Sequence, residues 1–215
     1  MNNIGKDLNL AAQKLLDGGV VSFPTETVMG LGVVYDNFDA YNKLNKIKGR
    51  PESKPYSMML ANVNEISKYA YIDSRAQKLI NAYLPGPLTL LLRSKDSVPG
   101  YVTHNTGVVG IRVPKFEVIN NLLDLVGKPL LVPSANPSNL PPALTVEQVV
   151  VYFNETLDYI VNNYCGNSLP STIVDLSNSD TKVLRVGAIK QEDIYKIVGE
   201  WLWRLLLVVT MVVMN

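Results

Sequence analysis

The most basic stretch of the chain, between Lys43 and Lys54, carries side chains that can bind a phosphorylated ligand. It places Lys48, Arg50 and Lys54 within seven residues, on a segment stiffened by glycine and proline. Arginine offers a planar fork to two oxygens, and lysine offers a mobile point charge. These cations can converge on a polyphosphate. The competing interpretation is a solvated helix end, where the helix dipole favours cations.

A second segment, SFPTETVMGLG at residues 22–32, combines hydroxyls, a carboxylate and glycines. The Thr-Glu-Thr of residues 25–27 follows the expected end of a short apolar strand. Gly30 and Gly32 then belong to an expected glycine turn, where the backbone can approach a ligand closely. We expect a compact polar site here, and the alternative is an ordinary polar turn after a strand.

A third segment, LLVPSANPSNLPPA at residues 130–143, leaves an expected strand and enters a loop with four prolines. Ser134, Asn136 and Ser138 give this rigid loop two hydroxyls and an amide. Such a loop at a strand end suits ligand recognition. A plain proline-rich connector is the alternative.

Two arginines stand in stretches that are typical of strands. Arg112 lies in the apolar GIRVP, and Arg185 lies in VLRVGAI, shortly after the STIVDL that contains Ser171. Burying an unpaired cation is costly. Each arginine is therefore expected either to form a structural ion pair or to face a cavity.

The chain has one histidine, His104, and one cysteine, Cys165. These counts exclude an intramolecular disulfide, a cysteine-rich zinc site and any site with several imidazoles. Neither residue has a readable charged neighbour, so we expect no nucleophile there. No protein-held metal site is expected. The P-loop and dinucleotide fingerprints are absent, so a bound nucleotide must be held by side-chain cations and hydroxyls.

These residues must be positioned by a mixture of helices and strands. The chain has 215 residues, of which 47% are hydrophobic and 18% charged, with a net charge of +1. This composition predicts one folded domain and argues against coating nucleic acid by bulk charge. The pattern predicts an α/β or α+β fold with a mixed sheet. Helices are expected over residues 7–16, 39–47, 62–69, 74–83, 115–126 and 145–153, and strands over 20–23, 56–60, 88–92, 108–113, 130–132, 158–162, 172–176 and 182–186.

The last stretch, residues 201–215, is apolar at twelve of fifteen positions. It is shorter than the roughly 20 residues that span a bilayer, so we expect no stable membrane insertion. It can be a packed terminal element, an oligomer or membrane-surface contact, or a sequence unrelated to the function of the domain. The N-terminus does not look like a signal peptide, and we expect a cytoplasmic protein.

Seven motifs, in order, resemble one family, the YrdC/TsaC-like threonylcarbamoyl-AMP synthases in their short single-domain form. They are PTETVMGLG, KGRP, PGPLT, IRVP, PSAN, STIVD and LRVG, and they cover roughly residues 8–198. Met29 replaces the usual tyrosine of the first motif. The resemblance implies a YrdC-like domain over residues 1–199, with a twisted mixed sheet flanked by helices around an open basic cavity. Residues 200–215 then form an apolar tail.

The resemblance implies a reaction of L-threonine, bicarbonate or carbon dioxide, and ATP. The products are threonylcarbamoyl-AMP and pyrophosphate, and the adenylate then serves a transferase complex that modifies adenosine in tRNA. Magnesium would bridge phosphate oxygens without a protein cage. The implied ATP-binding residues are Lys48, Arg50, Lys54, Ser134, Asn136 and Arg185, with Lys48 and Arg50 catalytic, and the implied threonine pocket is Thr27, Arg112 and Ser171.

Two other functions compete with this one. Because relatives have a basic cavity that accommodates RNA, the chain can be an RNA- or nucleotide-binding protein without catalysis. A carbamoyl-adenylate enzyme with another acceptor, as in hydrogenase maturation, is the second rival. The extra acylphosphatase-like and zinc-finger regions of those enzymes are not present in this sequence.

Overall fold

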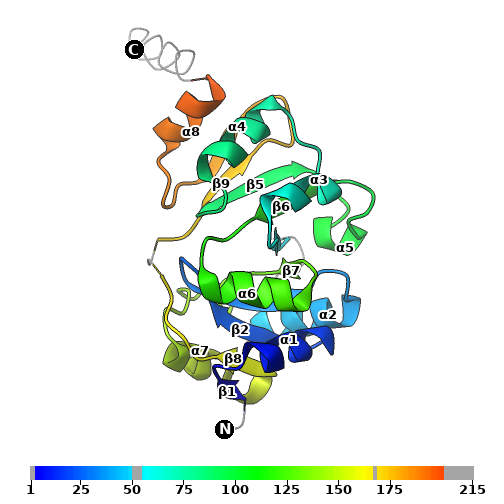
Figure 1. Ribbon diagram of the computed structural model, residues 1–215, viewed down its shortest axis with the longest axis vertical. Coiled ribbons are helices and arrows are strands. Elements are labelled where there is room, and N and C mark those ends of the chain that lie inside the picture. Colours follow the sequence, from blue (N-terminus) through cyan, green and yellow to red (C-terminus); the bar gives the residue numbers. More distant parts are fainter. Residues whose placement is uncertain (1–2, 50–54, 167–168, 201–215) are drawn as a thin grey trace.

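The computed structural model describes residues 3–49, 55–166 and 169–200. Their strands form one sheet in the order β1-β8-β2-β3-β7-β4-β6-β5-β9-β10, and Figure 1 shows the sheet running the length of the molecule. The strands are β1 (Ile4–Gly5), β2 (Val21–Pro24), β3 (Met29–Val34), β4 (Ser57–Met59), β5 (Leu88–Arg93), β6 (Val108–Arg112), β7 (Leu130–Leu131), β8 (Tyr159–Val161), β9 (Thr172–Asp175) and β10 (Lys182–Arg185).

Helices connect most of these strands. They are α1 (Leu8–Leu16), α2 (Phe38–Lys48), α3 (Ile66–Tyr69), α4 (Ser74–Tyr83), α5 (Gly100–Thr103), α6 (Glu117–Val126), α7 (Val146–Phe153) and α8 (Gln191–Val198), with short 3-10 turns at Val63–Glu65 and Asn154–Thr156. The predicted helices at 7–16, 39–47, 74–83, 115–126 and 145–153 are confirmed to within two residues at each end.

The sheet is mixed, as predicted. β2 pairs antiparallel with β3, and β3 pairs antiparallel with β7, whereas β4 with β6 and β5 with β9 are parallel pairs. Because the sheet contains strands of both directions, loops from several parts of the chain reach the same edge. This brings together residues that are far apart in the sequence.

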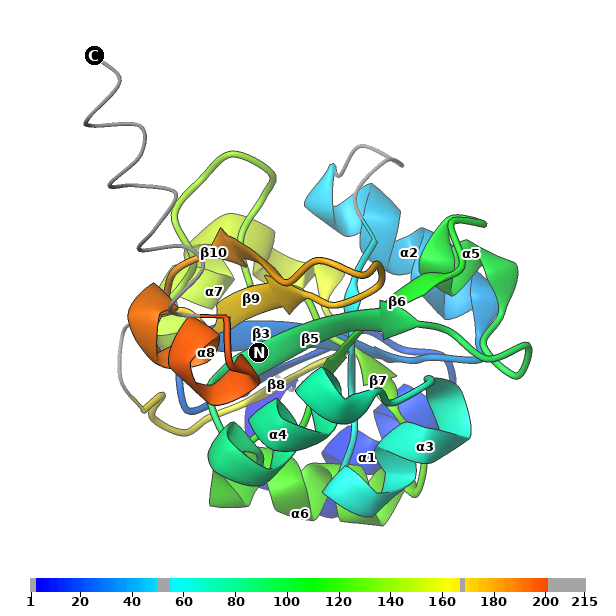
Figure 2. The ribbon, with the colours of Figure 1, turned by 90° about the horizontal axis from the view of Figure 1, so that it is seen from above.

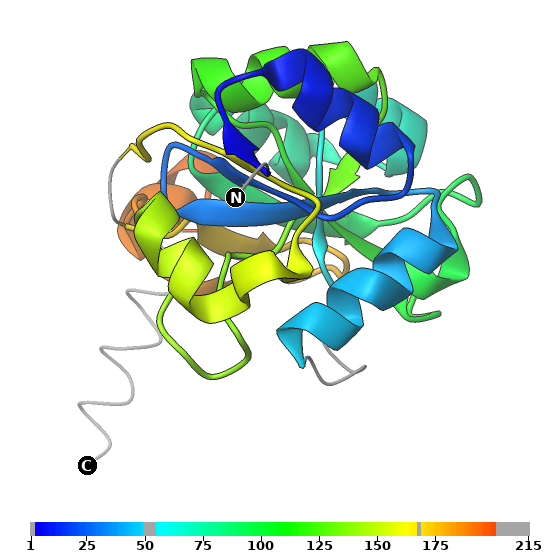
Figure 3. The ribbon, with the colours of Figure 1, turned by 90° about the horizontal axis from the view of Figure 1, so that it is seen from below.

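Helices cover both faces of the sheet. Figures 2 and 3 show α1 and α6 on one face, and α2 and α7 on the other. Under α1 and α6, the side chains of Leu15, Phe23 and Leu122 share a core cluster. A larger cluster, which includes Leu44 of α2 and Leu79 of α4, draws on helices from both faces of the sheet. The predicted fold, a mixed sheet flanked by helices, is confirmed.

The predicted glycine turn after Thr27 is wrong, because Gly30 and Gly32 lie inside strand β3. The six residues of β3 are all buried, so the strand lacks the alternation of a half-exposed strand. A Cβ atom on Gly32 would lie 2.5 Å from Cε1 of Phe23. These glycines therefore make room for the Phe23 ring.

Helix α2 carries the predicted basic segment to the edge of the site. The Asn37 side chain caps its start by accepting a hydrogen bond from the Ala40 N–H. Gly49 ends the helix in a left-handed conformation, with φ of 56°. The last helical residue is therefore Lys48.

In the three described ranges, no helix has both the length and the hydropathy needed to cross a bilayer. The predicted apolar tail, residues 201–215, lies outside the described residues, as do the predicted ligands Arg50 and Lys54.

Candidate active site

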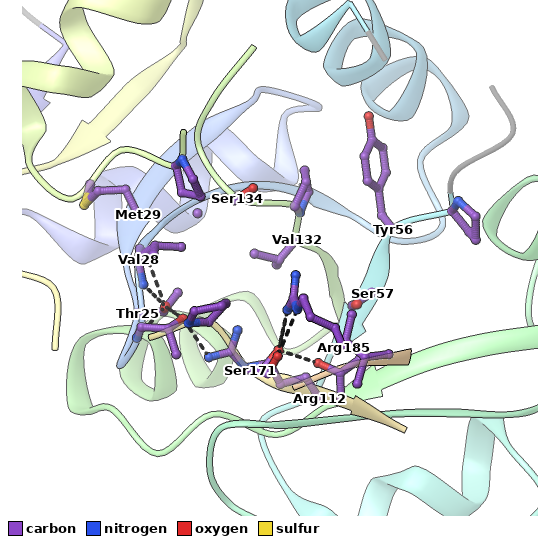
Figure 4. Close-up of a pocket in the computed structure, with 18 residues that line it drawn as sticks. Thr25, Val28, Met29, Tyr56, Ser57, Arg112, Val132, Ser134, Ser171 and Arg185 are labelled. Atoms are coloured by element: carbon purple, nitrogen blue, oxygen red, sulfur yellow. Dashed lines mark hydrogen bonds between the residues drawn. The ribbon is translucent and has the colours of Figure 1, made fainter. Parts of the chain in front are cut away.

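One cavity of about 210 Å³ lies where the ends of strands β2, β6 and β10 and the start of β4 meet the loop after β7 and the segment before β9. Figure 4 shows its polar side chains pointing toward a common space. Two guanidinium groups, Arg112 and Arg185, line this space. Six small hydroxyl side chains accompany them: Thr25, Thr27, Ser57, Thr89, Ser134 and Ser171.

The turn between β2 and β3 is fixed by its own hydroxyls. Thr25 Oγ1 donates to the Val28 carbonyl at 2.8 Å, and it accepts a hydrogen bond from the Thr27 N–H at 3.1 Å. The two threonine hydroxyls lie 3.0 Å apart. Both threonines are buried, with 2% of their surface exposed. The turn is thus a rigid part of the cavity wall.

Arg112, the last residue of β6, both forms an ion pair and faces the cavity. Its Nη2 lies 2.9 Å from Oε1 of Glu26 and donates to Thr27 Oγ1 at 3.1 Å. The side chains of Arg112 and Glu26 are only 11% and 13% exposed. The sequence left open whether this cation forms an ion pair or faces a cavity, and Arg112 does both.

Arg185, at the end of β10, is held by the segment that enters β9. Its Nε and Nη2 donate to the Ser171 carbonyl at 3.1 and 2.8 Å, and Nη2 also donates to Ser171 Oγ. Ser171 Oγ in turn lies 2.9 Å from Thr89 Oγ1. Partial burial, followed by repulsion from Arg112, lowers the pKa of Arg185. Two positive groups therefore share one small polar cavity.

Lys48 is placed differently from these arginines. Only 2% of its surface is exposed, and Nζ donates to the carbonyls of Ser134 and Asn136, both at 2.6 Å. In return, the Lys48 carbonyl accepts a hydrogen bond from the Ser138 N–H. Lys48 is not part of the cavity lining. It fastens the end of α2 to the PSAN loop that borders the cavity.

Asn136 also works within its own loop. Its Nδ2 donates to the carbonyls of Pro137 and Leu140, and its Oδ1 accepts from Ser134 Oγ at 2.6 Å. Of the pair Ser134 and Asn136, only Ser134 lines the cavity. The amide shapes the loop that presents the serine.

Five of the predicted ligands thus come together around the cavity, namely Thr27, Arg112, Ser134, Ser171 and Arg185. Lys48 and Asn136 are not part of the lining, and the roles predicted for them as direct ligands stay predictions. Ser57 and Thr89 were not among the predicted ligands. Thr89 belongs to the PGPLT motif, so the sequence offered a way to find it. Ser57 belongs to none of the seven motifs, and it reaches the cavity because β4 pairs parallel with β6, with Ser57 opposite Gly110.

His104 and Cys165 do not line the cavity. His104 Nε2 lies 3.0 Å from the hydroxyl of Tyr41, a residue of helix α2. Burial raises the pKa of Cys165 to about 11, so its thiol is protonated at neutral pH. Among the described residues, no group of three His, Cys, Asp or Glu side chains is placed to hold a metal ion.

The Sua5/YciO/YrdC family model, whose description reads telomere recombination, matches residues 13–187. This chain belongs to the Sua5/YciO/YrdC family. The match covers all seven motifs identified in the sequence, so the resemblance stated on those motifs is confirmed.

Curated relatives of this family member carry the name threonylcarbamoyl-AMP synthase. One from Vibrio parahaemolyticus is 31% identical over 191 residues, which are 87% of this chain and 100% of that protein. Another, from Pyrococcus abyssi, is 32% identical over 197 residues, which are 90% of this chain. This chain spans only 57% of the P. abyssi protein.

A solved structure of P. abyssi Sua5 complexed with L-threonine has the same fold. It superposes with a TM-score of 0.86 at 31% identity, over 92% of this chain and 60% of that one. The family member described here therefore shares its architecture with a protein that binds L-threonine.

Proposed function

We propose that this chain is an L-threonylcarbamoyladenylate synthase, a nucleotidyltransferase. It forms threonylcarbamoyl-AMP and pyrophosphate from L-threonine, bicarbonate or carbon dioxide, and ATP. The observation that carries the proposal is the convergence of Arg112 and Arg185 with small hydroxyls in one cavity. The names of the relatives, and the threonine complex of one of them, support the choice of substrates.

The reaction needs no covalent enzyme intermediate. The threonine amine loses a proton and forms a nitrogen–carbon bond with carbon dioxide, which gives a carbamate. A carbamate oxygen then attacks the α-phosphorus of ATP in line, and the bond to the bridging oxygen of pyrophosphate breaks. Catalysis then rests on positioning and on neutralising charge. Neither His104 nor Cys165 is needed, and neither lines the cavity.

The threonine subsite lies around Arg112. Its guanidinium pairs with the substrate carboxylate, which is the charge-assisted contact that arginine makes best. Thr27, fixed by Thr25 and by Arg112, and Ser171, fixed by Arg185, supply hydroxyls on either side. Small hydroxyl side chains leave room for a small amino acid.

The nucleotide subsite lies on the side of Arg185 and Ser134. Arg185 meets the nucleotide, while Lys48 and Asn136 keep the PSAN loop in the shape that presents Ser134. We assign the triphosphate to Arg50 and Lys54, and Lys48 acts on the nucleotide through the loop that its Nζ holds. Magnesium enters bound to ATP through phosphate oxygens and water. The carboxylate of Glu26 is already paired with Arg112. The product passes to the enzymes that modify adenosine in tRNA.

The test is pyrophosphate release from ATP and Mg²⁺, measured with and without L-threonine and bicarbonate, and with L-serine as the control amino acid. Release that needs both co-substrates, and that falls when L-serine replaces L-threonine, supports the proposal. ATP binding without release would instead favour a non-catalytic nucleotide- or RNA-binding protein. In that case RNA affinity should fall steeply with salt.

A further inference from the structure

The carboxylate of Glu26 is unusual because its hydrogen-bonding capacity is not used. Both oxygens are buried, and neither accepts a hydrogen bond from the described residues. Oε1 nevertheless lies 2.9 Å from Nη2 of Arg112. Nε of Arg112 is likewise buried and has no hydrogen-bond partner among the described residues. The two groups are paired by charge and distance, without an aligned hydrogen bond.

Such an ion pair is expected to contribute little to the stability of the folded protein. An ionised carboxylate can accept about four hydrogen bonds, and nearly all buried polar groups in folded proteins have a partner. Desolvating two charges is offset only when geometry and further hydrogen bonds are good. The pair between Glu26 and Arg112 does not meet that condition, which points to a role in the site rather than in stability.

Glu26 is held in place by its backbone. The turn that contains it is fixed by the hydroxyl of Thr25. Behind the turn, the Gly166 N–H donates to the Thr25 carbonyl, and a Cβ atom on Gly166 would lie 2.5 Å from the Glu26 carbonyl oxygen. The carboxylate is thus fixed behind the cavity wall, outside the lining itself.

Arg112 is the group that this carboxylate can influence. It lines the cavity beside Arg185, so two like charges share one small space. With Glu26 ionised, the three groups carry one net positive charge instead of two. The carboxylate therefore reduces the repulsion that would otherwise push the two guanidiniums apart.

We propose that Glu26 is a positioning residue for Arg112, which fixes the guanidinium in the cavity wall so that the carboxylate of the amino-acid substrate meets a preset donor. The identity of that amino acid rests on the proposed function. The positioning of Arg112 does not, because both residues lie in the described structure without any ligand.

The first test compares Glu26→Gln with a matched control. Glu26→Gln keeps the size of the side chain and removes its charge. We expect the KM for L-threonine to rise by about tenfold or more, while kcat and the KM for ATP change by less than about threefold. Asp36→Asn removes a carboxylate from a more exposed ion pair with Lys128 and should change none of these constants. Glu26→Asp keeps the charge and should recover part of the threonine affinity.

The second test asks whether Glu26 acts through Arg112. In a double-mutant cycle with Arg112→Gln, the change at Glu26 should cost nothing further once the guanidinium is gone. The doubly substituted protein carries no unpaired buried charge, so it also serves if Glu26→Gln alone folds poorly. Fully additive losses of threonine affinity in this cycle would overturn the proposal.

A third measurement separates this inference from the proposed function. The Nε–Hε signal of Arg112 is recorded by ¹⁵N NMR in the ligand-free protein, and L-threonine binding is measured by calorimetry. We expect Glu26→Gln to shift and broaden the Arg112 signal and to weaken binding. A wild-type protein that binds threonine without turnover contradicts the proposed function alone. An Arg112 signal that is the same in wild type and Glu26→Gln overturns the positioning role, whatever the protein catalyses.

Discussion

Two basic regions border the same cavity, and they use their cations in different ways. In the arginine wall, formed by Arg112 and Arg185, the guanidiniums face the cavity while part of each is held by protein groups. In the second region, which we call the lysine clamp, Lys48 is almost completely buried and its Nζ donates hydrogen bonds to two carbonyls of the PSAN loop. The residue type alone therefore does not tell which cation meets a ligand.

The difference follows from the shape of the two side chains. Arginine has five N–H donors spread over a plane, so one edge can bind the protein while another faces a ligand. Lysine carries its donors on one atom. When Nζ is buried against two carbonyls, as in Lys48, most of its capacity is used inside the protein.

The largest expected effect is that of Arg185→Lys in the arginine wall. A lysine cannot hold the Ser171 carbonyl and face the cavity at once, so kcat/KM for the synthase reaction should fall by about 10²-fold. Stability should change little, because the residue is exposed on one side. Steady-state pyrophosphate release and thermal unfolding check the two parts.

Arg75→Lys is the matched control for this change. Arg75 also donates to backbone carbonyls, those of Asn178 and Ser179, but it lies away from the cavity. Its substitution should leave kcat/KM unchanged. Equal losses in both variants would show that activity depends on anchoring of the β9–β10 segment in general, and the arginine wall would lose its special role.

Lys48→Met tests the lysine clamp. The change keeps the apolar stem and removes two charge-assisted hydrogen bonds, so the free energy of unfolding should fall by about 2–4 kcal/mol. Activity should fall by about tenfold, because Ser134 loses its fixed loop. Urea denaturation and pyrophosphate release are measured together. Lys46→Met, two residues earlier on an exposed position, should change neither. A large loss of activity at unchanged stability would mean that Lys48 contacts ATP directly.

A smaller effect is expected from Thr89→Val, which removes one hydroxyl next to the arginine wall. Thr89 Oγ1 lies 2.9 Å from Ser171 Oγ, and it helps to orient that hydroxyl. The isosteric change should raise the KM for L-threonine by about three- to tenfold, as expected for one lost neutral hydrogen bond. An unchanged KM would remove Ser171 from the threonine subsite.

The smallest effect concerns Cys165, which neither region uses. Because burial raises its pKa to about 11, the thiol should react with iodoacetamide far more slowly than a free cysteine at pH 8. The stability that comes from keeping the thiol neutral is fully present below about pH 9 and is lost as the pH rises toward 11. Alkylation rates across this range check the direction. Cys165→Ser should retain activity.

Most of the fold followed from sequence periodicity and turn residues. Helix α4 begins and ends where the pattern placed it, at Ser74 and Tyr83, because Asp73 caps it and apolar residues recur at helical spacing. Strand β3 was missed because Gly30 and Gly32 looked like a turn. Only the packing of the Phe23 ring against these glycines explains their place in a strand.

The candidate site was predicted in composition but not in arrangement. Motif order brought Thr27, Arg112, Ser171 and Arg185 into one group, and the structure places them around one cavity. The inward turn of Lys48 was not predictable, because it depends on a loop 86 residues later in the chain. The pairing of Glu26 with Arg112 likewise depends on the parallel and antiparallel registers of distant strands.

The most direct measurement of the central claim is the mass of the product formed from L-threonine, ATP and [¹³C]bicarbonate. The account predicts threonylcarbamoyl-AMP with one added ¹³C, formed by the wild type and by Arg75→Lys and strongly reduced in Arg185→Lys. An adenylate product without the label, or equal yields of labelled product from Arg75→Lys and Arg185→Lys, would contradict it.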